Sequence, residues 1–469
     1  MEAKVKKEIE SGGQPPVQGT TIGFGERLGY GMGDFASNIV FAAIATFLTY
    51  YYTDVVGVSA AIVGTILLFS RVFDGVTDIG MGFVVDKTKS KHGKARPWLL
   101  WLALPFALLT VLLFSVPEMG TAATIIYIVV TYNLLNLVYT GINIPYGVLN
   151  SLLSQDQYQR SVLNIFRMFM AIAATLLISV MVLPMVDFFG GGSIGWQITF
   201  ALFALLAFGF FLTTFFTTKE RVQAADPSKE SQNIPLKKGL KALFKNKYWC
   251  LMVFFMIATY SLQGLNTGVN VYYAEYILND PGLVGLLTAV SLVPMLATML
   301  VMAPFIKRVG KRNAIISGCI GIGIGTAVIA VNPESLTFVI IGTIIRGIAM
   351  APVTGSMFAM LADTIEYGEW KTGVRTEGLV YSAGSFGTKV GNGLGAAMIG
   401  WILAFGGYLS GTAGGQQPES ALIAIEFMFI YMPLIFALIQ LVLMLFYKLD
   451  KLYPQIVSDL KDRSETIRE

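Results

Sequence analysis

Long apolar runs separated by short polar segments fill most of the chain. A bilayer core about 30 Å thick needs about 20 consecutive apolar residues per helix, and such runs lie near 28–52, 60–85, 98–117, 121–150, 162–187, 196–217, 248–277, 283–305, 313–331, 336–361, 378–404 and 420–447. The pattern predicts an all-α membrane protein with twelve transmembrane helices. Composition agrees, because 55% of the 469 residues are hydrophobic and only 13% are charged, an apolar share above that of a typical soluble domain.

The positive charges between these runs fall in alternate loops. Loops retained in the cytoplasm carry the excess of lysine and arginine. This rule places in the cytoplasm the loops that contain Arg160 and segments 87–96, 219–247, 307–312 and 371–375. The other loops, near Asp54, Glu118, Asp187, Asp280, Glu334 and Glu419, contain no lysine or arginine. We therefore predict a multi-pass protein of the cell membrane with both termini cytoplasmic. The net charge of +4 describes this topology, and we expect no nucleic-acid partner.

A polar, charged segment divides the chain near its middle. We predict a cytoplasmic N-terminal tail at 1–22, a six-helix bundle at 23–218, a cytoplasmic central loop at 219–247, a second six-helix bundle at 248–448 and a cytoplasmic C-terminal tail at 449–469. Basic residues surround a glycine in the loop after the second helix of each half, at Gly93 and at Gly310. This weak echo favours a duplicated six-helix unit.

Acidic residues inside the apolar runs are the strongest sign of function. A carboxylate at the centre of a spanning helix costs roughly 2.5 to 3.5 kcal/mol on insertion scales, so such residues mark substrate or ion paths. Asp74 and Asp78 are four residues apart and so lie one turn apart on one helix face. Their repulsion is relieved by a shared proton or by a cation, and Na⁺ suits oxygen ligands. The alternative is that Asp78 only pairs with Arg71 or lies at a helix end.

Other polar residues extend this acidic cluster to neighbouring helices. Asp34 on the first helix is followed one turn later by Asn38, and Thr140 and Asn143 place neutral oxygens on the fourth helix. Carboxylates and amides suit the hydroxyl groups of a sugar, and an aromatic ring such as Tyr139 covers the apolar face of a sugar ring. The alternative for any one aromatic residue is packing or an interfacial position.

Several motifs resemble one family of transporters. Segments 28–34, 50–54, 71–78, 86–98, 143–146 and 362–370 are similar to those of the glycoside–pentoside–hexuronide:cation symporters. The resemblance implies the major-facilitator fold, with two six-helix bundles that rock about a central site. It also implies import of a sugar by symport with Na⁺ or H⁺, with Li⁺ as a further coupling ion, and no cofactor. We expect a functional monomer in the lipid bilayer.

The resemblance also assigns roles to individual residues. It implies that Asp74, Asp78 and Thr140 bind the cation and that Asp34 contacts sugar hydroxyls, with Arg167 and Lys389 at family positions nearby. For these two cations the alternative is a structural salt bridge between helices. Melibiose permease, the best-known family member, has an aspartate where this chain has Asn143 and a tryptophan where it has Gly147. These departures put melibiose itself in doubt as the substrate.

Opposite charges face each other at the predicted cytoplasmic mouth. Lys94 and Arg96 follow the second helix, and Glu366 and Glu369 follow the tenth. We expect these residues to act as a gate that holds the outward-open state. The alternative is the ordinary excess of positive charge in cytoplasmic loops.

Three other functions are alternatives to sugar symport. Paired carboxylates also serve glycoside hydrolysis, but no catalytic domain stands outside the apolar runs and no phosphate-binding glycine loop occurs, so we expect no enzyme. A lysolipid:cation symporter of the same fold would need an apolar, laterally open groove instead of a closed polar pocket. A sugar sensor that does not transport would differ only in uptake.

Overall fold

The structure is a computed structural model that describes residues 22–88, 90–154, 156–221, 236–374, 377–411 and 415–466. Within these ranges the regular elements are helices, and no strand occurs. Ten helices are long and apolar enough to cross a membrane. The helices α3 and α14, with 28 and 29 residues, also exceed the length that a bilayer requires.

The first helix group comprises six long elements. They are α2 (Phe24–Ala43) with its π-helical continuations η1 (Ile44–Leu48) and η2 (Tyr51–Val55), α3 (Ala60–Lys87), α4 (Arg96–Leu113), α5 (Thr121–Leu153), α6 (Gln157–Phe188) and α7 (Gly192–Thr217). Each coincides with one of the first six predicted runs. The wider turns of η1 and η2 are a form of helix that is frequent at functional sites.

The second helix group follows in the same order. It comprises α9 (Lys247–Tyr276), a 3-10 turn η4 (Pro281–Leu283) leading into α10 (Val284–Met299) and α11 (Met302–Val309), α12 (Lys311–Val331), α13 (Leu336–Thr372), α14 (Glu377–Phe405), and α15 (Glu419–Glu426) continued by η5 (Phe427–Tyr431) and α16 (Met432–Phe446). These elements coincide with the last six predicted runs.

One predicted run, 283–305, is interrupted in the structure. The chain leaves the helix after Met299 and re-enters it at Met302. Pro304 explains the break, because its ring clashes with the carbonyl group four residues earlier and it has no N–H to donate. In the shorter helix α11, Pro304 stands in the first turn, where a proline is tolerated.

Two helices were not predicted from the sequence. The predicted central loop contains α8 (Leu236–Lys245), and the predicted C-terminal tail contains α17 (Leu449–Thr466). Both are amphipathic: Leu243 of α8 and Ile456 of α17 are buried in the cluster that includes Trp249 of α9. Most of the predicted N-terminal tail lies outside the described residues, and the domain boundaries stay a prediction.

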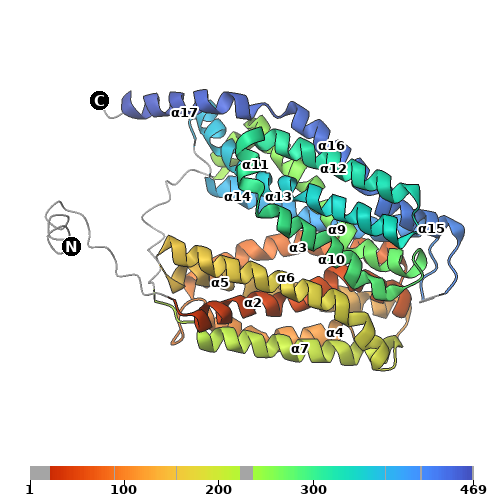
Figure 1. Cartoon of the computed structure of the whole chain (residues 1–469). Helices are drawn as coiled ribbons and strands as arrows, with labels where there is room; N and C mark the ends of the chain where they lie inside the picture. Colours follow the sequence, from red (N-terminus) through yellow and green to blue (C-terminus); the bar gives the residue numbers. More distant parts are fainter. Residues whose placement is uncertain are drawn as a thin grey trace.

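Figure 1 shows the first helix group in the lower half of the view and the second in the upper half, with the start of α2 and helix α17 toward the same end. Small residues let the two groups approach closely. A Cβ atom on Gly64 of α3 would lie 2.6 Å from the carbonyl oxygen of Ala397 of α14, and one on Gly285 of α10 would lie 2.6 Å from Val180 of α6. We call the end of the molecule that carries the loops without lysine or arginine the predicted outer end. Both of these contacts lie in the halves of the helices nearer that end.

Candidate functional site

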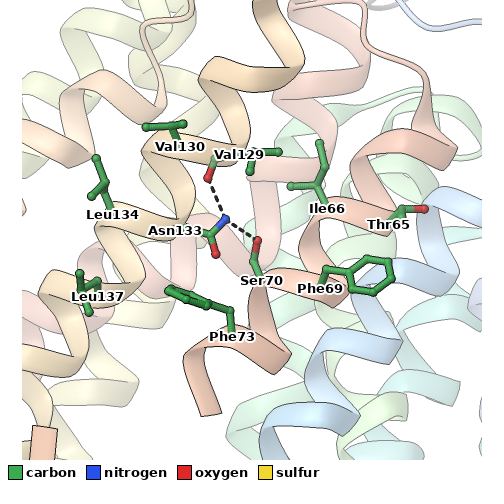
Figure 2. A pocket seen from close by; sticks show the side chains of 10 residues that line it. All are labelled: Thr65, Ile66, Phe69, Ser70, Phe73, Val129, Val130, Asn133, Leu134 and Leu137. Carbon is green, nitrogen blue, oxygen red and sulfur yellow. Dashed lines mark hydrogen bonds between the residues drawn. The ribbon is translucent and has the colours of Figure 1, made fainter. Parts of the chain in front are cut away.

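An apolar cavity of about 620 Å³ lies between α3 and α5, as Figure 2 shows. Its walls include the exposed side chains of Phe69, Val130 and Leu134, so it is an open groove and not an enclosed cavity. Its polar centre is Asn133, whose amide donates to the Ser70 hydroxyl at 2.9 Å. None of the predicted sugar-binding residues lines this groove.

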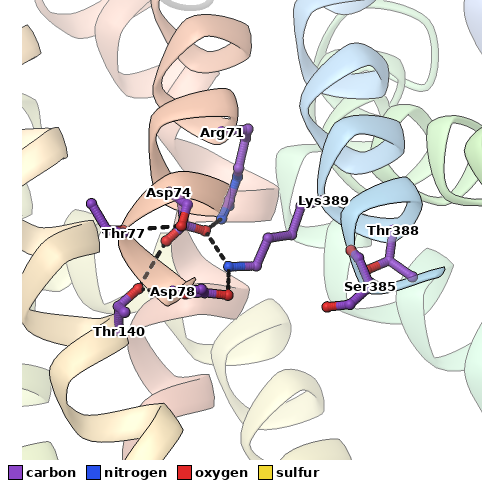
Figure 3. A network of polar contacts seen from close by, with 8 residues as sticks. All are labelled: Arg71, Asp74, Thr77, Asp78, Thr140, Ser385, Thr388 and Lys389. Carbon is purple, nitrogen blue, oxygen red and sulfur yellow. Dashed lines mark hydrogen bonds and ion pairs between the residues drawn. The ribbon is translucent and has the colours of Figure 1, made fainter. Parts of the chain in front are cut away.

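One turn along α3 from Ser70, the acidic pair lies between α3 and α5 (Figure 3). The Thr140 hydroxyl is 3.0 Å from Oδ1 of Asp74 and 2.9 Å from Oδ1 of Asp78. A threonine hydroxyl has a single hydrogen to donate, so it can satisfy only one of the two carboxylates at a time. The structure thus brings together the three predicted cation ligands.

Lys389 of α14 also contacts the acidic pair. Its ammonium group lies 3.2 Å from Oδ2 of Asp74 and forms an ion pair with Oδ2 of Asp78 (Figure 3). We had predicted Lys389 among the sugar-binding residues, with a salt bridge between helices as the alternative. In this structure it forms that salt bridge, and it joins the second helix group to the first.

Arg71 lies close to the same carboxylates. Its guanidinium group is 3.8 Å from Oδ2 of Asp74 and 5.7 Å from the ring centre of Phe41. The sequence left open a pair between Arg71 and Asp78. In the structure Arg71 contacts Asp74, and the described contacts of Asp78 are with Thr140 and Lys389. Two carboxylates, one ammonium and one guanidinium together leave the cluster with no net formal charge when all four groups are ionised.

Asp34 forms a second charged centre on α2. Its Oδ2 accepts a hydrogen bond from Nε of Arg167 on α6 at 2.8 Å, and the amide of Asn38 donates to the Asp34 backbone carbonyl at 2.8 Å. The Arg167 guanidinium also lies 4.9 Å from the ring centre of Tyr146. Arg167 thus contacts the Asp34 carboxylate, whereas the Asn38 amide bonds to the backbone of its own helix.

The aromatic residues near Asp34 are mostly committed to packing. Tyr30 and Tyr146 stack with ring centres 4.7 Å apart and are almost fully buried, so neither presents a free ring face for a sugar in this state. Tyr139 lies against Phe41, with ring centres 3.7 Å apart. Asn143 is half-buried on α5, on the same helix as Thr140.

Two of the predicted gate residues, Lys94 and Arg96, contact the end of α7 and the segment that follows it. Glu220 caps the start of α4, where it accepts from the backbone N–H of Lys94 at 2.8 Å and of Arg96 at 3.0 Å. The Arg96 guanidinium donates to the carbonyl of Phe215 at 2.7 Å. Glu366 and Glu369 lie near the end of α13. The predicted gate, in which Lys94 and Arg96 meet Glu366 and Glu369 in the outward-open state, stays a prediction.

One asparagine inside an apolar run is buried without a described partner. Asn136 of α5 is completely buried, and neither its amide nitrogen nor its carbonyl oxygen has a hydrogen-bond partner among the described residues. It lies one turn before Thr140. The only signal in the sequence was an asparagine inside an apolar run, which does not reveal burial without a partner.

Comparisons with known proteins agree with this architecture. A family model described as MFS/sugar transport protein matches residues 29–451. The chain is 37% identical to an isoprimeverose transporter of Lactiplantibacillus pentosus, over 94% of this chain and 92% of the relative. It is 33% identical to a putative glycoside/cation symporter of Escherichia coli, over 94% and 95% of the two chains.

A solved structure is similar in fold. The D-xylose–proton symporter superposes with a TM-score of 0.61 at 14% identity, covering 89% of this chain and 97% of that one. The major-facilitator fold and the family predicted from the motifs are thereby confirmed, and these relatives are named as transporters. The chain is a multi-pass membrane protein that belongs to the MFS/sugar transport family, and within it to the glycoside–pentoside–hexuronide:cation symporters.

Proposed function

We propose that the chain imports a sugar of the glycoside, pentoside or hexuronide class across the cell membrane by symport with Na⁺ or H⁺. The similarity to an isoprimeverose transporter over nearly the whole chain supports a glycoside as the first substrate to test. We assign the cation to Asp74, Asp78 and Thr140. We assign the sugar to the surface formed by Asp34 and Arg167, with Asn38, Tyr139 and Asn143 as further candidate contacts. We place both termini on the cytoplasmic side.

The observation that carries the proposal is the position of the Lys389 ammonium group against both carboxylates of the acidic pair. An ammonium group is itself a monovalent cation, so in this state it neutralises the charge that a coupling ion would neutralise. An ion that binds the same oxygens must displace the ammonium or share them with it. Because Lys389 and the acidic pair belong to different helix groups, ion binding changes the contact between the groups.

This exchange supplies a physical basis for coupling. When the ion replaces Lys389 at the carboxylates, the salt bridge between α3 and α14 is lost and the two groups are freer to move relative to each other. A sugar that binds the Asp34 and Arg167 surface favours one of the resulting states. By linkage, the ion and the sugar then raise each other's affinity by the same factor.

The test is uptake by the purified full chain in sealed proteoliposomes. Labelled isoprimeverose and a panel of other glycosides, pentosides and hexuronides are offered under a Na⁺, a Li⁺ or a pH gradient applied separately. We expect one sugar class to accumulate under one of these gradients. Asp74→Asn and Asp78→Asn should each abolish accumulation, because the amide keeps the volume but removes the charge that binds the ion. Asp187→Asn, at an exposed position of a predicted outer loop, is the matched control.

Several outcomes would contradict the proposal. Normal accumulation by Asp74→Asn or Asp78→Asn under the wild-type driving ion would exclude the pair as the coupling site. Binding of sugar without uptake under any gradient would favour the sensor. The groove between α3 and α5 has the apolar lining that suits a lipid chain, so a labelled lysolipid is included in the panel, and its uptake in place of every sugar would favour the lysolipid symporter.

A further inference from the structure

A second polar cluster lies at the predicted outer end, apart from the acidic pair. Its centre is Asp54 of η2, which is only 3% exposed. The hydroxyl groups of Tyr276 and Tyr408 donate to Oδ1 of Asp54 at 2.7 and 2.5 Å, and the Thr53 hydroxyl donates to Oδ2 at 2.5 Å. Tyr276 ends α9 and Tyr408 follows α14, so the cluster joins the second helix group to the first.

Further contacts reinforce this junction. The Tyr272 hydroxyl lies 2.9 Å from that of Thr53 and can donate to it. The Tyr408 and Tyr276 hydroxyls lie 3.0 Å apart, but each has a single hydrogen, which it donates to Asp54. The backbone N–H of Gly411 donates to the Thr53 carbonyl at 2.7 Å. The described contact therefore includes side chains and backbone from both groups, and it covers the end of the molecule opposite to α17.

The chemistry of the cluster differs from that of the acidic pair. Asp74 and Asp78 are paired with an ammonium group, whereas the predicted outer loops contain no lysine or arginine, and the described partners of Asp54 are hydroxyl groups. A buried carboxylate held only by neutral donors depends on keeping all of them. When the two helix groups separate, water replaces the hydroxyl groups around Asp54. The contact therefore has two favourable states, one with all its hydrogen bonds formed and one with the carboxylate in water.

We propose that Asp54, Tyr276 and Tyr408 form an outer gate that holds the two helix groups together at the predicted outer end in the state seen here. Opening of this gate exposes the sugar and cation sites to the outside. The gate rests on the alternating access of the proposed function. It concerns residues outside both proposed binding sites, and it can be tested without sugar or coupling ion.

The test measures the distance between the outer ends of the two groups. Spin labels are attached to Phe188→Cys at the end of α6 and Val331→Cys at the end of α12, which are 82% and 70% exposed. The two native cysteines are replaced in this background, and the full chain is reconstituted in lipid nanodiscs. Double electron–electron resonance then gives the populations of short and long distances. We expect the short distance to dominate in the chain with an intact gate.

Three gate variants should shift this balance. Asp54→Ala, Tyr276→Phe and Tyr408→Phe each remove hydrogen bonds to a buried charged group, and we expect each to raise the ratio of long to short distances by about tenfold. Asp54→Asn keeps the volume and one acceptor oxygen and removes a charge whose burial opposes closure, so its ratio should stay near or below that of the intact chain. Adding Tyr408→Phe to Asp54→Ala should change the ratio little further, because the bond is already lost.

Matched controls remove a tyrosine hydroxyl at the same end of the molecule but within one group. Tyr127 donates to the carbonyl of Leu112 at 2.9 Å, and Tyr273 donates to that of Pro333 at 2.6 Å. Tyr127→Phe and Tyr273→Phe should leave the distances unchanged. The proposal of an outer gate would be wrong if the distances are unchanged in the gate variants or if the controls shift equally. It would also be wrong if long distances dominate in the chain with an intact gate. None of these results depends on sugar uptake, so failure of the gate is distinct from failure of symport.

Discussion

At the scale of single residues, charged side chains inside the helices are held by partners on other helices. Asp34 on α2 pairs with Arg167 on α6, and Asp74 and Asp78 on α3 pair with Lys389 on α14. An ionisable group in a bilayer is tolerated when it is paired or faces water. Each pair therefore has a structural role and a candidate functional one, and substitutions have to separate the two.

Asp34→Ala tests the sugar surface. It removes a charge and two acceptors and leaves Arg167 without this partner, so we expect sugar affinity to fall by roughly 2 to 5 kcal/mol. Cation binding measured without sugar should be almost unchanged. Both binding isotherms on the purified variant decide the role, and Glu26→Ala is the control, because Glu26 pairs with Arg221 at the predicted cytoplasmic end. Lost cation binding with normal sugar affinity would assign Asp34 to the cation instead.

Lys389→Met tests the exchange at the acidic pair. Without the ammonium group the ion no longer competes for the carboxylate oxygens, so its affinity should rise by about 5- to 150-fold, the usual range of a coupling free energy. Accumulation of sugar should fall, because the ion-free carrier loses the group that neutralised the pair. Direct titration of the coupling ion measures the affinity. Lys311→Met, which breaks a similar pair with Asp363, should have no such effect, and weaker ion binding in Lys389→Met would refute the competition.

At the scale of helices, a half-buried arginine compensates for an irregular turn. The π-helical segment η5 interrupts the last spanning helix, and Arg346 of α13 donates to the carbonyls of Phe429 at 2.8 Å and Ile430 at 3.1 Å. It also donates to the Thr326 hydroxyl of α12 at 2.9 Å. In a bilayer, backbone groups without a regular partner must be satisfied inside the protein. One side chain thus fastens three helices.

Arg346→Met should therefore act on stability. We expect the free energy of unfolding to fall by about 1 to 2 kcal/mol, the scale of hydrogen bonds between helices in membranes, with ion dependence of uptake unchanged at low temperature. Thermal unfolding in detergent measures the loss. Arg308→Met, at an exposed site, is the control. Unaltered thermal stability would show that water or other groups replace the guanidinium.

At the scale of the whole molecule, the contact at the predicted outer end links conformation to pH. Asp54 lies beyond the candidate span Phe24–Leu48, and burial raises the pKa of its carboxyl group, an effect that hydrogen bonds from Thr53, Tyr408 and Tyr276 partly oppose. In the open state the group meets water and returns toward its ordinary pKa of about 4. A pKa raised in the closed state means that protonation stabilises closure, and that this stabilisation is lost as the pH rises through the raised pKa.

We therefore expect the closed population to fall as the pH rises above about 4, and to become independent of pH in Asp54→Asn. The spin-label distance between positions 188 and 331, recorded from low to neutral pH, checks this. The other titratable groups around Asp54 are Tyr50, Tyr272, Glu275, Tyr276 and Tyr408. Glu275→Gln is the control, and a pH response that vanishes in this variant but persists in Asp54→Asn would assign the titration to Glu275.

The sequence by itself determined the elements and the chemistry of this protein. Apolar runs of bilayer length are required wherever a helix meets lipid, so the spanning helices could be found from the pattern alone. Charged residues inside those runs are so costly that Asp34, Asp74 and Asp78 stood out as candidate functional residues without any structure. The family motifs then gave the fold and the class of substrate.

Only the tertiary structure decided which charges meet. Lys389 lies 311 positions from Asp78 along the chain, and no helical periodicity relates residues on separate helices, so its contact with the acidic pair depended on the packing of α3 against α14. The junction of Asp54 with Tyr276 and Tyr408 was invisible for the same reason. The amphipathic helices α8 and α17 were missed because their polar composition resembles a loop until a buried partner for their apolar face is known.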